Sequence, residues 1–113
     1  MNTIANIVYT VSDLDSAKAV QAALLDAQPH TDQPFYVGFN VGGLEIGLTP
    51  AQPGGTTSSV AHVRVPDLDA ALAAVQQAGA TVLNEAREVS PGTRVAAVQD
   101  AGGTTYGLIE HRS

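Results

Sequence analysis

The hydrophobic and polar positions of this chain follow one pattern twice. Residues 6–17 (NIVYTVSDLDSA) and residues 60–71 (VAHVRVPDLDAA) both alternate apolar and polar side chains before reaching Asp-Leu-Asp and a run of small residues. Alternation with a period of two is typical of a strand with one buried face. An aspartate in front of an alanine-rich segment is a typical helix N-cap. Each copy therefore predicts a strand followed directly by a helix.

Further strands are predicted after each helix. In the first half, apolar side chains alternate over residues 35–41, starting from Phe35, and a second strand is predicted over residues 44–49. Gly42-Gly43 between them predicts a tight hairpin, because glycine adopts a positive φ without a steric penalty. The second half contains three strand-like segments, at residues 81–89, 93–99 and 104–110.

The first helix and the segment after it complete the prediction for the first half. Ala17, Val20 and Leu24 are spaced three and four residues apart, so we expect them to face the core. The polar segment QPHTDQ (28–33) predicts a loop, in which His30 faces solvent.

Together these elements predict one α+β domain over residues 1–113, built from two modules that each contain a strand, a helix and two or three antiparallel strands. Module one covers residues 1–50 and module two covers residues 59–113, and the turn-forming residues AQPGGTTS (51–58) are the linker. We expect the helices on the outer face of a curled mixed sheet, because strand twist then leaves the other face as a concave trough.

Composition excludes several classes of protein. The chain has 113 residues, 44% of them hydrophobic, and no cysteine, which excludes disulfides, thiol catalysis and thiolate metal sites. No apolar run approaches the ~18 residues of a membrane span. The N-terminal sequence lacks the pattern of a secretory signal, so a cytoplasmic location is expected.

The charge balance narrows the choice of partners. Five Lys and Arg against 11 Asp and Glu give a net charge of −6. Nucleic acid and anionic membrane surfaces are therefore poor partners, since they require clustered cations. The acidic charge favours a cationic or zwitterionic small ligand. The alternative is that it serves solubility alone.

The repeated pattern resembles a known family. Two βαβββ modules, each opening with a strand, Asp-Leu-Asp and a helix, resemble the vicinal oxygen chelate superfamily, which includes glyoxalase I, extradiol dioxygenases and the bleomycin-type resistance proteins. The family commonly closes on Asp-Pro-x-Gly and a short apolar strand. In DAGGTTYGLIEH (100–111) Asp100 and Gly103 match, whereas Ala101 replaces the proline. The resemblance implies a homodimer.

The resemblance also implies a divalent metal held by four side chains, on the first and last strands of each module. Alignment to the family pattern puts these positions at Asn6, Gly47, Val60 and Gly107. Valine and glycine have no donor atom, and an amide is a weak ligand. The sequence therefore predicts no metal and no other cofactor. A rudimentary metal site built from Glu45 and His62 is the alternative.

The same alternation predicts which side chains line the trough. Where one set of side chains faces the helices, the other set must face the trough, and a few polar groups on an apolar floor are typical of small-molecule sites. The five side chains expected to contact the ligand are Asn6, Tyr36, Glu45, His62 and Arg64. The alternative is a solvent-filled trough in which the charged residues make weak surface ion pairs.

These observations favour a metal-independent protein that binds a small organic ligand, similar to the drug-sequestering resistance proteins, with no assigned catalytic residue. The alternative is a glyoxalase-like lyase or isomerase that uses His62 and Glu45, with or without a divalent metal, since histidine can act as a general base near neutral pH. A protein-interaction module is a third hypothesis, which predicts a filled trough.

Overall fold

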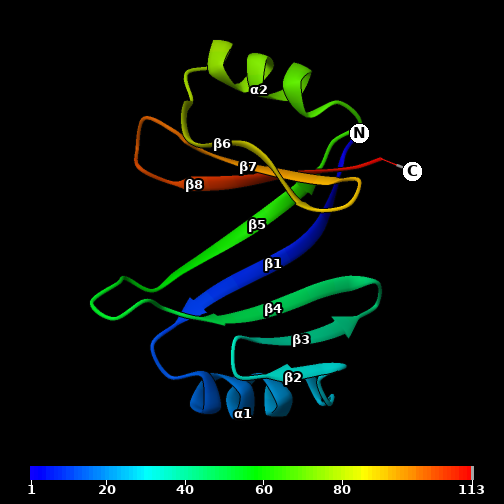
Figure 1. Cartoon of the computed structure of the whole chain (residues 1–113), viewed down its shortest axis with the longest axis vertical. Helices are drawn as coiled ribbons and strands as arrows, with labels where there is room; N and C mark the ends of the chain where they lie inside the picture. Colours follow the sequence, from blue (N-terminus) through cyan, green and yellow to red (C-terminus); the bar gives the residue numbers. More distant parts are fainter. Residues whose placement is uncertain (113) are drawn as a thin grey trace. The chain divides into compact units, whose positions relative to one another are not determined.

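The computed structural model describes residues 1–112, which fall into two compact units. The N-terminal unit spans Asn6–Val60, and the C-terminal unit combines Met1–Ala5 with the chain from Ala61 onward. Each unit contains one helix and four strands, drawn in Figure 1. Neither helix in the described part of the chain is long and apolar enough to cross a membrane.

The N-terminal unit is a mixed sheet with one helix. Its strands lie in the order β2-β3-β4-β1, with β1 parallel to β4 and the other neighbours antiparallel. The parallel pair forms because the chain crosses over through the helix before it returns to lie beside its first strand. The elements are β1 (Thr3–Val11), α1 (Leu14–Leu25), β2 (Thr31–Gln33), β3 (Tyr36–Val41) and β4 (Leu44–Pro50).

The C-terminal unit repeats this plan. Its strands lie in the order β5-β8-β7-β6, with β5 parallel to β8 and antiparallel pairing elsewhere. Both modules therefore have the order βαβββ, which confirms the predicted α+β class. The elements are β5 (Ser58–Arg64), α2 (Leu68–Gln77), β6 (Thr81–Ser90), β7 (Thr93–Gln99) and β8 (Thr105–His111).

The repeated aspartates begin both helices, as predicted. Asp13 Oδ1 accepts a hydrogen bond of 3.0 Å from the backbone N–H of Ser16, and Asp67 Oδ1 accepts one of 3.1 Å from that of Ala70. Each cap satisfies a backbone donor that has no partner within the helix, and such a cap stabilises a helix by about 1 kcal/mol.

Each unit has its own hydrophobic core between its helix and one face of its sheet. In the N-terminal unit Val37, Phe39, Ile46 and Leu48 are buried, and Phe39 is completely enclosed. The core of the C-terminal unit consists of Val65, Leu68, Leu72, Ala96, Val98 and Leu108. Strand alternation therefore decides which face of each sheet remains open for function.

The predicted buried face of the first helix is confirmed at Ala17 and wrong at Val20 and Leu24. Val20 is 55% exposed and Leu24 is 75% exposed, whereas Leu14, Ala17 and Leu25 pack against the core. An alanine-rich helix has few large apolar residues, so more than one side of it can show apolar residues at helical spacing. The sequence pattern alone therefore placed Val20 and Leu24 on the wrong side. The two leucines at the helix ends decide which side is buried.

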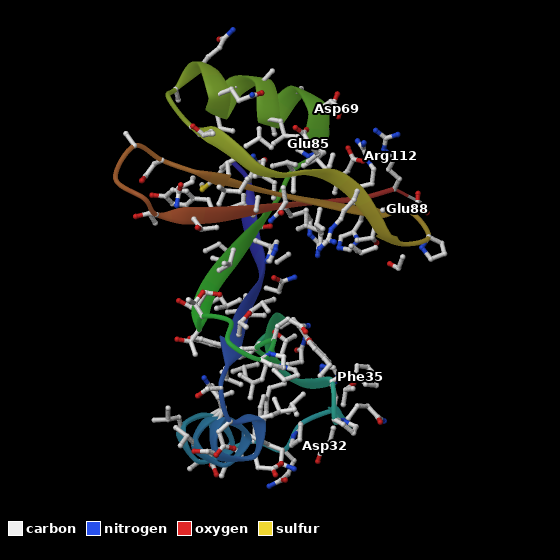
Figure 2. All side chains as sticks on the ribbon, turned by 60° about the vertical axis from the view of Figure 1, so that its left-hand side comes forward. Asp32, Phe35, Asp69, Glu85, Glu88 and Arg112 are labelled. Carbon is white, nitrogen blue, oxygen red and sulfur yellow. The ribbon has the colours of Figure 1, made fainter. Side chains whose placement is uncertain are left out.

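The predicted loop over residues 28–33 and the start of the next strand are also corrected. Thr31–Gln33 form the short strand β2, which pairs with β3. Edge strands in proteins are commonly short and polar, so this strand lacks the apolar alternation that a buried strand shows. Phe35 lies in the turn before β3 and is 69% exposed, as Figure 2 shows at the surface of this unit.

Candidate functional site

The face of the N-terminal sheet opposite α1, called here the open face, gathers polar side chains. Paired residues in neighbouring strands share a face, and Asn6 on β1 and Asn40 on β3 both pair with Glu45 on β4. In the next row of the same face, Gly38 pairs with Gly47. Asn6, Tyr36 and Glu45 therefore lie on the face that the alternation predicts.

Glu45 is the centre of a hydrogen-bonded cluster on this face, called here the carboxylate cluster. The Tyr36 hydroxyl donates a bond of 2.7 Å to Glu45 Oε2. His30 Nε2 lies 2.8 Å from Oε1 and 2.9 Å from Oε2 of the same carboxylate. The Glu45 side chain is 28% exposed, so these three residues form a polar site that solvent can reach.

Two glycines make room for the carboxylate cluster. A Cβ at Gly47 would lie 2.8 Å from Tyr36 Cε1, and a Cβ at Gly38 would lie 2.7 Å from Glu45 Oε2. Both distances are shorter than van der Waals contact. Glycine in a strand often marks such a close approach, and here it lets the tyrosine ring and the carboxylate lie directly on the sheet.

The electrostatics of the carboxylate cluster keep Tyr36 protonated. Burial, then the hydrogen bond and the negative charge of Glu45, raise the pKa of Tyr36 above its ordinary value of 10.0. The protonated hydroxyl is therefore a fixed donor to Glu45. A carboxylate has about four acceptor sites, and His30 and Tyr36 leave part of that capacity for a further donor.

His30 is held in place from two sides. Its Nδ1 lies 2.8 Å from the Thr31 hydroxyl, opposite the Nε2 that meets Glu45, and its backbone N–H donates to the carbonyl of Gly38 at 2.8 Å. The sequence prediction of a solvent-facing loop histidine is confirmed, since the His30 side chain is 46% exposed and precedes β2, but its bond to Glu45 was not predicted. Alternation could not reveal His30, because only the pairing of β2 with β3 brings it beside Glu45.

Asn6 adds a polar atom to the open face. Its Oδ1 is buried and has no hydrogen-bond partner among residues 1–112. A buried oxygen without a partner costs free energy unless a donor reaches it. Asn6 is therefore suited to accept a hydrogen bond from a ligand.

His62 and Arg64 lie in the C-terminal unit, on the face of β5 opposite α2. The His62 ring lies on Gly107, where a Cβ would collide with it. Burial lowers the pKa of His62, and its Nδ1 has no partner within the described residues. Burial therefore favours the uncharged form of the His62 ring, whereas Arg64 is exposed.

The residues present do not fit the four-ligand metal that the resemblance implies. Gly47 and Gly107 carry no donor atom, and the rings of Tyr36 and His62 occupy the space beside them. Within residues 1–112, no three or more His, Cys, Asp or Glu side chains lie where they could hold a metal ion together. No step of the chemistry is therefore assigned to a metal.

Comparison with solved structures identifies the fold. A methylmalonyl-CoA epimerase from Mycobacterium tuberculosis superposes with a TM-score of 0.72 at 20% identity, covering 98% of this chain and 89% of the other. The chain has the vicinal oxygen chelate fold. A hypothetical protein from Bacillus halodurans shares this fold with a TM-score of 0.76 at 16% identity, covering 99% and 96% of the two chains.

A third structure with the vicinal oxygen chelate fold contains a ligand. The methylmalonyl-CoA epimerase from Streptomyces coelicolor, in complex with 2-nitronate-propionyl-CoA, has a TM-score of 0.71 at 17% identity and covers 100% and 97% of the two chains. No protein-family model and no curated protein sequence matches this chain. The comparisons therefore establish the fold of this chain but not its activity.

Proposed function

We propose that this protein binds a small organic ligand without a metal, on the open face of the N-terminal unit. The observation that carries the proposal is the carboxylate cluster, in which Tyr36 and His30 hold Glu45 over a floor of glycine. Such a preorganised carboxylate recognises a ligand without having to be ordered during binding. The Asn6 oxygen supplies a second acceptor on the same face.

The ligand expected at this site carries an ammonium or another hydrogen-bond donor on an apolar body. The open face offers acceptors at Glu45 and Asn6 together with the apolar side chain of Val8. A charge-assisted bond to a carboxylate is roughly twice as strong as a neutral one. The net charge of −6 favours the same sign of ligand.

The charge of this chain argues against the coenzyme A esters that bind to proteins of the same fold. A polyanionic ligand needs cations at its phosphates. Lys18 is the only Lys or Arg between residues 6 and 60, and it already pairs with Asp32 at 3.0 Å.

Titration with two probes of similar shape and opposite charge tests the proposal. Phenethylamine and 3-phenylpropionate are added to EDTA-treated protein, and the amide signals of Gly38 and Gly47 are followed by NMR. We expect saturable shifts with the amine and none with the carboxylate, because only the amine complements Glu45. E45Q should weaken amine binding at least tenfold, since a charged partner is worth about 1.5–3 kcal/mol.

The matched control is E85Q, the same change at an exposed glutamate on β6. It should leave the affinity for phenethylamine unchanged. Binding that appears only after a divalent ion is added, or that survives E45Q, would contradict the proposal.

The alternative function is an isomerase that moves a proton on a carbon acid. His30 and Glu45 form the pair of groups that such a step needs, with the Tyr36 hydroxyl as a donor beside them. This reading predicts that aminoacetone, a carbon acid that carries an ammonium group, exchanges its carbon-bound protons for deuterium from heavy water faster in the presence of the protein, and that E45Q abolishes this acceleration. Under the binding proposal, no exchange above the buffer rate is expected.

Three predictions from the sequence accompany this proposal. A ligand role for His62 and Arg64 would be visible as a loss of affinity in H62A and R64A. The homodimer would be visible as a doubled mass in sedimentation experiments, and the cytoplasmic location stays a prediction.

A further inference from the structure

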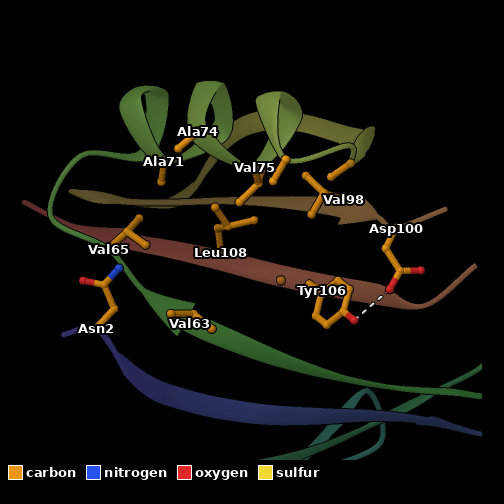
Figure 3. A pocket seen from close by; sticks show the side chains of 13 residues that line it. Asn2, Val63, Val65, Ala71, Ala74, Val75, Val98, Asp100, Tyr106 and Leu108 are labelled. Carbon is orange, nitrogen blue, oxygen red and sulfur yellow. Dashed lines mark hydrogen bonds between the residues drawn. The ribbon is translucent and has the colours of Figure 1, made fainter. Parts of the chain in front are cut away.

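The C-terminal unit contains an apolar cavity that the proposed function does not use. It has a volume of about 460 Å³ and lies between α2 and the strands β5, β7 and β8. Figure 3 shows Val63, Val65 and Leu108 of the sheet on one side and Ala71 and Val75 of α2 on the other. A cavity of this volume lies within the range of small-molecule sites.

The cavity exists because small side chains line the helix. Ala71 and Ala74 of α2 and Ala78 at its C-cap border the cavity opposite valines of the strands, so no large side chain fills the space. An apolar cavity of only about 150 Å³ already binds benzene. This cavity is about three times as large and has room for a substituted ring.

The equivalent place in the N-terminal unit has a different character. The cavity between α1 and β1 has a volume of about 350 Å³ and a mixed lining, made of the polar side chains of Ser12, Asp13, Ser16, Gln21 and Thr57 and of Tyr9, Val11, Ala17, Val20 and Leu48. In the C-terminal unit the polar lining residues are fewer, namely Asn2, Asp100 and Tyr106, so its cavity is the more apolar of the two.

One end of the apolar cavity carries a hydrogen-bonding pair. The Tyr106 hydroxyl donates to Asp100 Oδ2 at 2.9 Å, and both residues border the cavity in Figure 3. Asp100 Oδ1 is occupied by the backbone N–H groups of Gly102 and Thr104. Oδ2 accepts only from Tyr106 among residues 1–112 and can accept a second bond.

We propose that this cavity is a second ligand site, which takes a compact and mainly hydrocarbon molecule with one hydroxyl. The ring or chain fills the space beside Ala71 and Val75, and the hydroxyl donates to Asp100. The site lies within the C-terminal unit, so it does not depend on the carboxylate cluster around Glu45.

Titration with p-cresol and toluene tests the proposal, because the two molecules differ by one hydroxyl. Methyl signals of Val63, Val75 and Leu108 are followed by NMR. We expect saturable shifts with both probes and an affinity for p-cresol at least fivefold higher than for toluene. A71L should weaken p-cresol binding at least tenfold by filling the cavity, with A74L as a second filling variant at a more exposed position.

A73L is the matched control, since Ala73 is exposed and does not border the cavity. It should bind p-cresol as the wild type does, and E45Q should also leave this binding unchanged. Thermal unfolding of A71L and A74L verifies that both variants fold.

Three results would overturn the proposal. In the first, the methyl signals do not shift up to the solubility limit of p-cresol. In the second, A71L and A74L bind p-cresol with the same affinity as the wild type. In the third, the methyl signals shift with protein concentration in the absence of any probe. The last result would mean that a second copy of the chain fills the cavity.

Discussion

Glu45 and Glu110 stand on the last strands of the two modules in opposite environments. Glu45 is on the open face of β4, is 28% exposed and is bonded by Tyr36 and His30. Glu110 on β8 is completely buried under the start of α2. Its Oε2 accepts from the backbone N–H of Leu68 at 2.7 Å, and Arg94 and Arg112 pair with its Oε1.

The difference separates a structural carboxylate from one that is available to a ligand. The Leu68 N–H, then Arg94 and Arg112, lower the pKa of Glu110 from 4.5 to about 2. Every partner of Glu110 belongs to the fold, and nothing can reach it from solvent. The position in module one that matches Glu110 is Pro50, which has no charge. The glutamate of module one is instead Glu45, on the open face, where a ligand can contact it.

Neutralising each glutamate in turn should reveal the largest difference between the two modules. E110Q should cause the larger loss of unfolding free energy, several times that of E45Q, because it leaves Arg94 without its buried partner. E45Q should cost about 0.5–1 kcal/mol, as expected for a partly exposed pair. Urea unfolding of both variants measures this, and equal losses would contradict the assignment of roles.

The pH dependence of unfolding tests the role of Glu110 separately. Because the pKa of Glu110 is lowered in the folded state, its contribution to stability is complete above pH 4.5 and is lost as the pH falls toward about 2. The wild type should lose stability across this window, and E110Q should lose less. Urea midpoints between pH 2 and pH 6 provide the measurement, and parallel curves for the two proteins would be evidence against it.

Alanine at each of the two strand glycines compares the modules at equivalent positions. G47A should displace the Tyr36 ring and G107A should displace the His62 ring. Each should destabilise the protein by about 1–3 kcal/mol, the usual cost of overpacking. Only G47A should also reduce the affinity for phenethylamine. An equal loss in G107A would mean that the open face of the N-terminal unit is not the site.

The smallest effect concerns the ionisation of Tyr36. Its pKa is raised mainly by burial and then by Glu45, so its hydroxyl should ionise above pH 10. An absorbance titration at alkaline pH should show that E45Q lowers the pKa of one tyrosine toward 10. No change in E45Q would indicate that Tyr36 and Glu45 are not bonded in solution.

Alternation along the strands predicted the elements of both modules except β2, and the face on which Asn6, Tyr36 and Glu45 lie. It could not predict His30, which depends on the pairing of a short polar strand, or the burial of Glu110, which depends on the contact between α2 and β8. Those features arise from tertiary pairing, and periodicity reports only local structure. Val20 and Leu24 show the same limit, since the core of the N-terminal unit selects a different side of α1.

The most direct test of the central claim is the affinity of phenethylamine for EDTA-treated protein, compared between wild type and E45Q. If Glu45 binds the amine without a metal, binding should be saturable, the same before and after EDTA treatment, and at least tenfold weaker in E45Q. Binding that requires a divalent ion, or that E45Q leaves unchanged, would contradict it.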